Sequence, residues 1–215
     1  MSLRVLALGL LLGGVASTGA FEPVAEPYRA AAASAGAGGT VTGRVYEERR
    51  RPEGPEQPVV GAAVTFLPRS AEFLAKLEQI RRTARSSVNS YRAAASAILA
   101  LRASYEKELW ESGAADLVRA TVVDANGRFS VGDLPAGDWV LVATHSVKSD
   151  KRSGEASSKQ RSVYAPGTRL TGYATVIVWL REVKVVSRGL ETVDLTERSA
   201  WFSGVVEERA PDAGR

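Results

Sequence analysis

Apolar and polar residues alternate along most of the chain beyond residue 40, which is the pattern of strands with one buried face. In the segment 40–47, valine or glycine occupies positions 41, 43 and 45, and the polar or aromatic residues Thr42, Arg44 and Tyr46 alternate with them. The segment 173–186 is rich in β-branched residues and has a similar period. Residues 139–142, Trp-Val-Leu-Val, are apolar without interruption, which is typical of a strand central in its sheet. We predict a mainly β protein of about seven strands.

A different period occupies the segment 70–116. Apolar residues recur there every three or four positions, which indicates helix. One straight helix would carry the chain about 1.5 Å per residue away from the sheet, whereas the next strand must rejoin it. The segment therefore predicts an inserted hairpin of two antiparallel helices, with Ser70 as N-cap, a turn at 85–90 and a stop at Gly113. The apolar stripe consists of Phe73, Leu77, Ile80, Ala84, Tyr91, Ala94, Ile98, Leu101, Tyr105 and Leu109.

Two corners are predicted between residues 121 and 142. Gly127 can adopt a positive φ without steric cost, and the Asp124 carboxylate can bond the amides that follow it, so a tight turn is expected. Pro135 cannot continue a ladder of hydrogen bonds, and Gly137 completes the second corner. The side chains expected to form the core are Val45, Val64, Phe66, Val122, Phe129, Leu134, Trp139, Leu141, Val178, Val193 and Leu195.

The spacing of these turn residues resembles the signature of the carboxypeptidase regulatory-like domain, in the transthyretin-like (prealbumin-like) group of β-sandwiches. The resemblance covers residues 39–67 and 120–195, and it implies a seven-stranded antiparallel, immunoglobulin-like sandwich. The helical insertion over 70–116 departs from the family pattern, in which a short loop joins these strands. Such domains are mostly accessory modules, so the resemblance names no substrate. The matching residues are Asp124, Gly127, Phe129, Leu134, Pro135, Gly137 and Trp139, preceded by the segments 40–45 and 58–64.

The first 20 residues have the organisation of a cleaved signal peptide. Arg4 precedes an apolar run over 5–15, and small residues lead to a predicted cleavage site after Ala20. The run is shorter than the about 20 apolar residues of a membrane-spanning helix, so no transmembrane anchor is expected. The chain contains no cysteine, which excludes a disulfide framework and an acylated lipoprotein terminus. We therefore expect a bacterial protein that is periplasmic or secreted.

Segments of biased composition set the expected boundaries. Residues 21–39 are rich in Ala, Gly and Pro and are expected to form a flexible linker, in which a helical turn at 30–33 would be marginal alone. The sandwich domain is expected over 40–207, with a long polar loop over 146–170. Residues 208–215 are expected to be a disordered tail.

The sequence offers no recognisable catalytic, metal-binding or cofactor-binding constellation. His145 is the single histidine, whereas a catalytic zinc site needs two or three protein ligands in set geometry. Asp124 and Asp133 lie near Gly127, but this glycine does not occupy the position that an EF-hand calcium loop requires. Arg44 stands in a strand where related isopeptide-forming domains need a lysine, and a permanently charged arginine is no nucleophile. We expect no enzyme and no cofactor, and an unrecognised enzyme is the second alternative.

Candidate binding residues are therefore sought on the surface. Arg81, Arg82, Arg85 and Arg92 cluster toward the turn of the predicted hairpin, where they serve either solubility or an anionic partner. Trp201 follows a predicted turn and is the best exposed candidate for stacking on a sugar. The leading hypothesis is a non-catalytic binding or scaffolding module of the cell envelope, with an envelope protein or an anionic envelope polymer as partner. A carbohydrate-binding accessory module is the first alternative.

The net charge argues against a nucleic-acid partner. A charge of +4 is too small for the protein to be expected to bind nucleic acid.

Overall fold

The computed structural model describes residues 24–35, 38–48, 56–149 and 168–211, so the predicted signal peptide over 1–20 lies outside the described residues. The prediction of a mainly β fold is confirmed, and the described residues form nine strands where about seven were expected. The helices are α1 (Ala25–Ala35), α2 (Ala71–Thr83) and α3 (Val88–Glu111), with 3-10 turns η1 (Ala115–Leu117) and η2 (Glu197–Ser199). The strands are β1 (Gly39–Glu47), β2 (Gln57–Pro58), β3 (Ala63–Pro68), β4 (Arg119–Val122), β5 (Arg128–Leu134), β6 (Gly137–Ser149), β7 (Thr168–Val185), β8 (Leu190–Thr196) and β9 (Phe202–Pro211).

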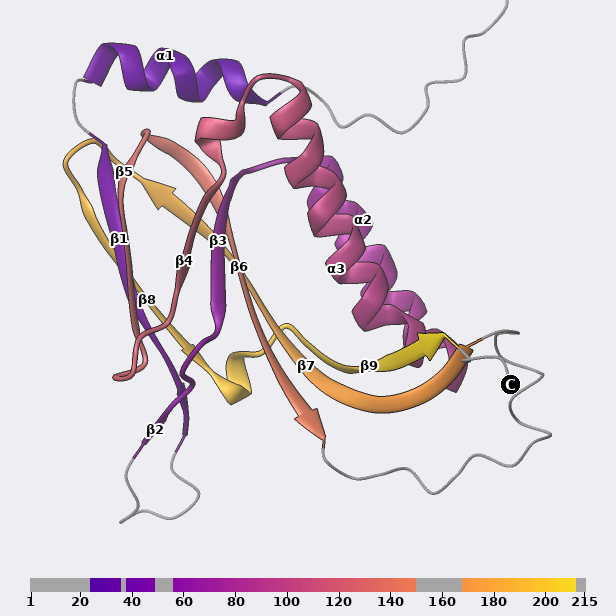
Figure 1. Cartoon of the computed structure of the whole chain (residues 1–215). Helices are drawn as coiled ribbons and strands as arrows, with labels where there is room; N and C mark the ends of the chain where they lie inside the picture. Colours follow the sequence, from indigo (N-terminus) through magenta and orange to yellow (C-terminus); the bar gives the residue numbers. More distant parts are fainter. Residues whose placement is uncertain (1–23, 36–37, 49–55, 150–167, 212–215) are drawn as a thin grey trace, which may run out of the picture.

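Two sheets face one another across the core (Figure 1). In the first sheet, β1 pairs antiparallel with β2 and β5, and parallel with β8. In the second sheet, the order is β4-β3-β6-β7-β9 and each neighbouring pair is antiparallel. The rings of Phe66 in β3 and Phe129 in β5 lie 6.5 Å apart and join the two sheets. The described residues therefore form a β-sandwich, and a transthyretin-like connectivity stays a prediction.

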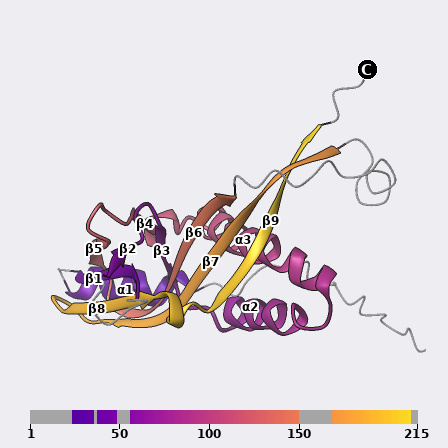
Figure 2. The ribbon, with the colours of Figure 1, turned by 90° about the horizontal axis from the view of Figure 1, so that it is seen from below.

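The helical hairpin forms a third layer on the other face of the second sheet (Figures 1 and 2). Residues 139–143 of β6 are all at most 2 % exposed, although successive side chains of a strand point to opposite faces. Both faces of this central strand are therefore covered, one by the first sheet and the other by the hairpin. On the hairpin side, the Tyr105 ring stacks on Phe73 at 4.7 Å, and its hydroxyl donates to the Pro68 carbonyl. The hairpin thus belongs to the core, whereas the sequence pattern predicted an insertion with a seam of its own.

The ends of the hairpin have the predicted caps. The Ser70 hydroxyl accepts the Phe73 amide hydrogen at 3.2 Å, which satisfies one of the free donors at the start of α2. At the end of α3, Gly113 has φ +73°, and the Ala114 amide donates back to the Leu109 carbonyl at 2.7 Å. This is a Schellman motif, which requires a left-handed residue and favours glycine.

Helix α1 is a correction to the flexible linker expected over 21–39, because it covers one end of the sandwich (Figure 1). Tyr28 is 6 % exposed, and its hydroxyl donates to the Asp138 carbonyl and accepts the Arg69 amide hydrogen at 2.9 Å. Burial raises the pKa of this hydroxyl. The Tyr28 ring meets Trp139 edge-on, with 5.0 Å between ring centroids. These tertiary contacts stabilise a helix whose length and composition make it marginal alone.

The turn between β4 and β5 forms as predicted. Asp124 Oδ1 accepts the amide hydrogens of Asn126 and Arg128, both at 2.8 Å. Gly127 has φ +76°, and a Cβ at this position would lie 2.8 Å from the Val45 carbonyl oxygen. A tight turn and close packing on β1 therefore both require the glycine.

The predicted core is largely buried, with one clear error. The corner before β6 forms as expected, because the Trp139 indole N–H donates to the Pro135 carbonyl at 2.9 Å beside Gly137. Val122 is 62 % exposed, whereas the next residue, Val123, is 2 % exposed. Successive side chains of a strand point to opposite faces, so a shift of one residue exchanges the buried and exposed faces. The prediction placed the strand in the correct segment but assigned the buried face to Val122 and not to Val123.

Three strands extend beyond their predicted ends. Part of the polar loop expected over 146–170 belongs to the sheet, because β6 ends at Ser149 and β7 begins at Thr168; the rest of this loop lies outside the described residues. β9 runs to Pro211, where a tail was expected from 208. In these extensions, β7 pairs with β6 or with β9, and this pairing satisfies the backbone hydrogen-bonding groups of the polar residues. The polar side chains of these residues gave no indication of such pairing.

Candidate functional site

A polar groove of about 810 Å³ runs across strands β1, β4, β5 and β8. Val41 and Val45 of β1 are fully buried, so the alternating residues Thr42 and Arg44 face outward from the first sheet. The neighbouring strands continue both rows, because their registers place residues opposite these two positions. The polar side chains that line the groove include Thr42, Arg44, Arg128, Ser130, Thr192 and Asp194.

The two rows differ in chemistry. Thr42 lies between Ser130 of β5 and Thr192 of β8, which gives a row of three hydroxyls. Arg44 lies between Arg128 and Asp194, which gives a row of charges. Hydroxyls both donate and accept hydrogen bonds, guanidinium groups only donate, and carboxylates only accept. The groove therefore offers every kind of polar contact within two adjacent rows.

Arg44 is the side chain of the groove with the most ionic and aromatic contacts. Its Nε lies 3.7 Å from Asp194 Oδ1, and its Nη1 lies 3.6 Å from Glu56 Oε2. Its guanidinium carbon also lies 4.7 Å from the centre of the Tyr46 ring. These partly exposed ion pairs contribute little to stability, but together they hold the guanidinium in place. Arg128 has no ion pair among the described residues and is exposed.

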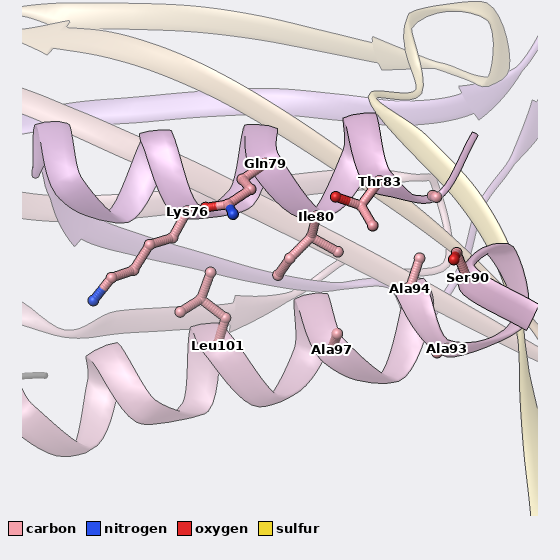
Figure 3. Close-up of a pocket in the computed structure, with 10 residues that line it drawn as sticks. Lys76, Gln79, Ile80, Thr83, Ser90, Ala93, Ala94, Ala97 and Leu101 are labelled. Carbon is pink, nitrogen blue, oxygen red and sulfur yellow. The ribbon is translucent and has the colours of Figure 1, made fainter. Parts of the chain in front are cut away.

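A second recess, which we call the hairpin groove, lies between α2 and α3 and has a volume of about 500 Å³. Figure 3 shows Ile80 and Leu101 pointing toward one another across it, with Ala97 on α3 nearby. Lys76 is the only charged residue in its lining. The hairpin groove is therefore mainly apolar, with Gln79, Thr83 and Ser90 as its uncharged polar residues, in contrast to the polar groove.

The structure separates the four predicted arginines. Arg81 lies 2.9 Å from Glu78, and its guanidinium carbon lies 5.1 Å from the centre of the Trp201 ring. Arg82 is 3.9 Å from the same glutamate and is 74 % exposed, and Arg85 is exposed in the turn after α2. Arg81 is thus a packing residue, whereas Arg82 and Arg85 remain available to a partner.

Arg92 lines a third recess, beside the end of β9. This recess measures about 420 Å³ and also contains Glu207 and Arg209, which pair at 2.6 Å. The tip of the hairpin also contacts the start of β9, because the Tyr91 hydroxyl donates to the Ser203 carbonyl at 2.9 Å. The turn end of the helical hairpin, which carries these arginines, therefore packs against β9 of the second sheet and does not project alone into solvent.

Sequence reasoning selected the wrong tryptophan as the most exposed. Trp201 is partly buried against the core, whereas Trp110 on α3 is 66 % exposed. The signal was present in the sequence, because Trp110 falls outside the three-and-four spacing of the apolar stripe. The polar groove was also missed, although the polar positions Thr42 and Arg44, which alternate with buried valines in the segment 40–47, supply the β1 residue of each of its two rows.

The described residues show no metal site. No three or more His, Asp or Glu side chains come together there in a way that could hold a metal ion. His145, the single histidine, lies partly exposed in β6. No helix in the described part of the chain is long and apolar enough to cross a membrane.

Comparisons with known proteins give distant structural neighbours. No protein-family model and no curated protein matches the chain. The chain is similar to a candidate carbohydrate-binding protein of Pseudomonas aeruginosa, at 14 % identity over 75 % of this chain and 89 % of that one, with a TM-score of 0.36. It is also similar to the pilus backbone protein of Streptococcus pneumoniae, at 13 % identity over 74 % of this chain, with a TM-score of 0.26.

The chain spans 40 % of the length of the pilus protein. The class that the fold defines is a β-sandwich carrying a helical layer on one sheet. Membership of the carboxypeptidase regulatory-like family stays a prediction from the turn signature.

Proposed function

We propose that this protein is an exported, non-catalytic binding module of the bacterial cell envelope, and that its polar groove binds carbohydrate. The observation that carries the proposal is the grouping of outward-facing hydrogen-bonding side chains in two adjacent rows on β5, β1 and β8. Export rests on the pattern of residues 1–20.

The chemistry of the groove matches a sugar. Each sugar hydroxyl both donates and accepts, so it needs partners of both kinds close together. Arg128 supplies donors, Asp194 supplies acceptors, and Thr42 and its neighbours supply both. Val122, 62 % exposed at the margin of the groove, offers an apolar contact for the C–H face of a ring. The volume of about 810 Å³ lies within the usual range of ligand sites.

Binding of cell-envelope and plant polysaccharides to the mature protein tests this proposal. Affinity electrophoresis through gels that contain each polysaccharide should show retardation in at least one, and calorimetry with its oligosaccharides should give a dissociation constant. The double variant Arg128→Ala, Ser130→Ala should weaken binding roughly tenfold, which corresponds to about 1.4 kcal/mol. Arg181→Ala, an exposed arginine on β7, is the matched control and should bind as the wild type. Equal binding by both variants would place the site elsewhere.

A second candidate function is attachment to an anionic envelope polymer through the exposed arginines of the hairpin. The supporting observation is the exposure of Arg82, Arg85 and Arg92 at one end of the molecule. Reversing these three to Glu should leave the melting temperature nearly unchanged and release the protein from washed envelopes at low salt. Reversal of Arg119, Arg181 and Lys184, three exposed cations on β4 and β7, is the control. Retention of both variants across a salt titration would contradict this function.

A further inference from the structure

Two carboxylates line the polar groove, and each already has partners in the protein. Asp124 Oδ1 accepts two backbone amide hydrogens of its own turn, both at 2.8 Å. Asp194 Oδ1 lies 3.7 Å from the Nε of Arg44. Backbone donors and a neighbouring guanidinium both favour the charged form of a carboxylate. The described lining of the groove therefore holds no negative charge without a partner.

The two arginines of the groove form a like-charged pair with unequal partners. Arg44 of β1 and Arg128 of β5 lie directly opposite one another in the antiparallel register. Cβ atoms at such positions are about 4.5–5.5 Å apart, and like charges there destabilise the sheet. Arg44 has Asp194 and Glu56 beside it, at 3.7 Å and 3.6 Å. Arg128 is exposed and has no ion pair among the described residues, so its positive charge is not offset.

An anionic group between the two arginines would offset this charge. A guanidinium is planar, and its fixed set of donors matches a carboxylate in a bidentate arrangement. The row of three hydroxyls on Thr42, Ser130 and Thr192 lies two positions along the strands, which is a distance of about 6.4–6.8 Å. A ligand that carries a carboxylate and several hydroxyls would therefore satisfy both rows together.

We infer that the polar groove binds an acidic glycan, with the carboxylate of a uronic acid between Arg44 and Arg128. The ring hydroxyls of the same sugar and of its neighbour meet the row of threonine and serine hydroxyls. This inference rests on the carbohydrate function proposed above, and it adds the class of sugar.

Oligosaccharides that differ only in charge test this inference. The probes are the tetramers of galacturonic acid and of glucuronic acid, each compared with its methyl ester, which keeps the rings and loses the negative charges. In calorimetry with the mature protein at low salt, at least one acid should bind roughly tenfold more tightly than its ester. Added salt should reduce this preference, because it screens the attraction between the carboxylate and the guanidinium.

Substitutions of Arg128 should change the preference for the acid. Arg128→Gln removes the charge and keeps a hydrogen-bond donor, so the preference should fall from roughly tenfold to roughly twofold or less. Arg128→Lys keeps the charge without the planar set of donors, and it should keep part of the preference. Arg181→Gln removes an exposed cation of β7 outside the groove lining, and its preference should equal that of the wild type.

The melting temperature of the ligand-free protein gives a second readout. Arg128→Gln removes the repulsion with Arg44, so at low salt this variant should melt at the temperature of the wild type or above it. Arg181→Gln is the control for the loss of one positive charge. A fall of several degrees in Arg128→Gln alone would mean that Arg128 has a structural partner, and this result would overturn the inference.

The binding results separate the class of sugar from the carbohydrate function itself. If glycans bind the protein but neither acid binds more tightly than its ester, the acidic class is wrong and the carbohydrate function stands. The same conclusion follows if Arg128→Gln keeps the full preference for the acid. If no glycan binds, whether neutral or acidic, the proposed carbohydrate function fails as well.

Discussion

The guanidinium carbon of Arg81 lies 5.1 Å from the centre of the Trp201 ring, so two residues expected to meet a ligand meet one another. Arg81 belongs to α2 and Trp201 precedes β9, and this contact fastens the helical layer to the edge of the second sheet. A cation over the face of an indole is attracted by the ring quadrupole. Arg81 is therefore a structural residue, although its sequence context resembles that of its exposed neighbours.

A double-mutant cycle measures this contact. Arg81→Ala and Trp201→Ala should show a coupling of about 0.5–1 kcal/mol in denaturant melts, as expected for a partly exposed cation–π pair. The control cycle combines Arg82→Ala with Trp201→Ala, and it should be additive within about 0.3–0.5 kcal/mol. Equal coupling in the two cycles would mean that the effect is general electrostatics and not the stacked contact.

Truncation of Trp139 should destabilise the protein far more than truncation of Trp110. The side chain is 0 % exposed in the central strand, and its loss leaves a cavity as well as an unsatisfied Pro135 carbonyl. Trp139→Ala should lower the free energy of unfolding by about 3–5 kcal/mol. Trp110→Ala, at a position that is 66 % exposed, should change it by less than about 0.5 kcal/mol. A similar loss in both variants would contradict the assigned core.

Removal of the Tyr28 hydroxyl tests whether α1 stabilises the sandwich. Tyr28→Phe removes the hydroxyl that bridges the Asp138 carbonyl and the Arg69 amide, while the ring contact with Trp139 remains. Loss of a buried bridge should cost about 1–3 kcal/mol, measured by thermal or denaturant unfolding. Tyr46→Phe, on the more exposed face of β1, is the control and should be nearly neutral. If neither substitution changes the free energy of unfolding, the result would support the original expectation that residues 21–39 form a flexible linker.

Replacement of the hairpin by a short glycine-rich linker from Pro68 to Leu117 should prevent formation of a stable native state. The variant would expose the face of β6 that the hairpin covers and would remove buried side chains such as Phe73 and Ile98. Circular dichroism and a hydrophobic dye should report lost cooperativity and exposed apolar surface. A variant that unfolds cooperatively with little dye binding would show that the hairpin is an independent insertion, as its sequence pattern suggests.

The sequence by itself determined the local features of this protein. The three-and-four spacing over 70–116 identified two helices, Ser70 and Gly113 identified their ends, and Asp124 and Gly127 identified a turn. These features depend on the backbone preferences and hydrogen bonds of residues that are close in the chain. A short stretch of sequence is therefore enough to predict them.

Only the tertiary structure decided where these elements meet. Helix α1 exists because Tyr28 reaches Asp138 and Trp139, more than a hundred positions away. The polar groove exists because β8 returns parallel to β1 and places Asp194 opposite Arg44. Local propensity carries no information about such pairings, because their energy comes from contacts and ladder bonds between segments that are distant in the sequence. The binding surfaces of this sandwich are therefore a product of its topology.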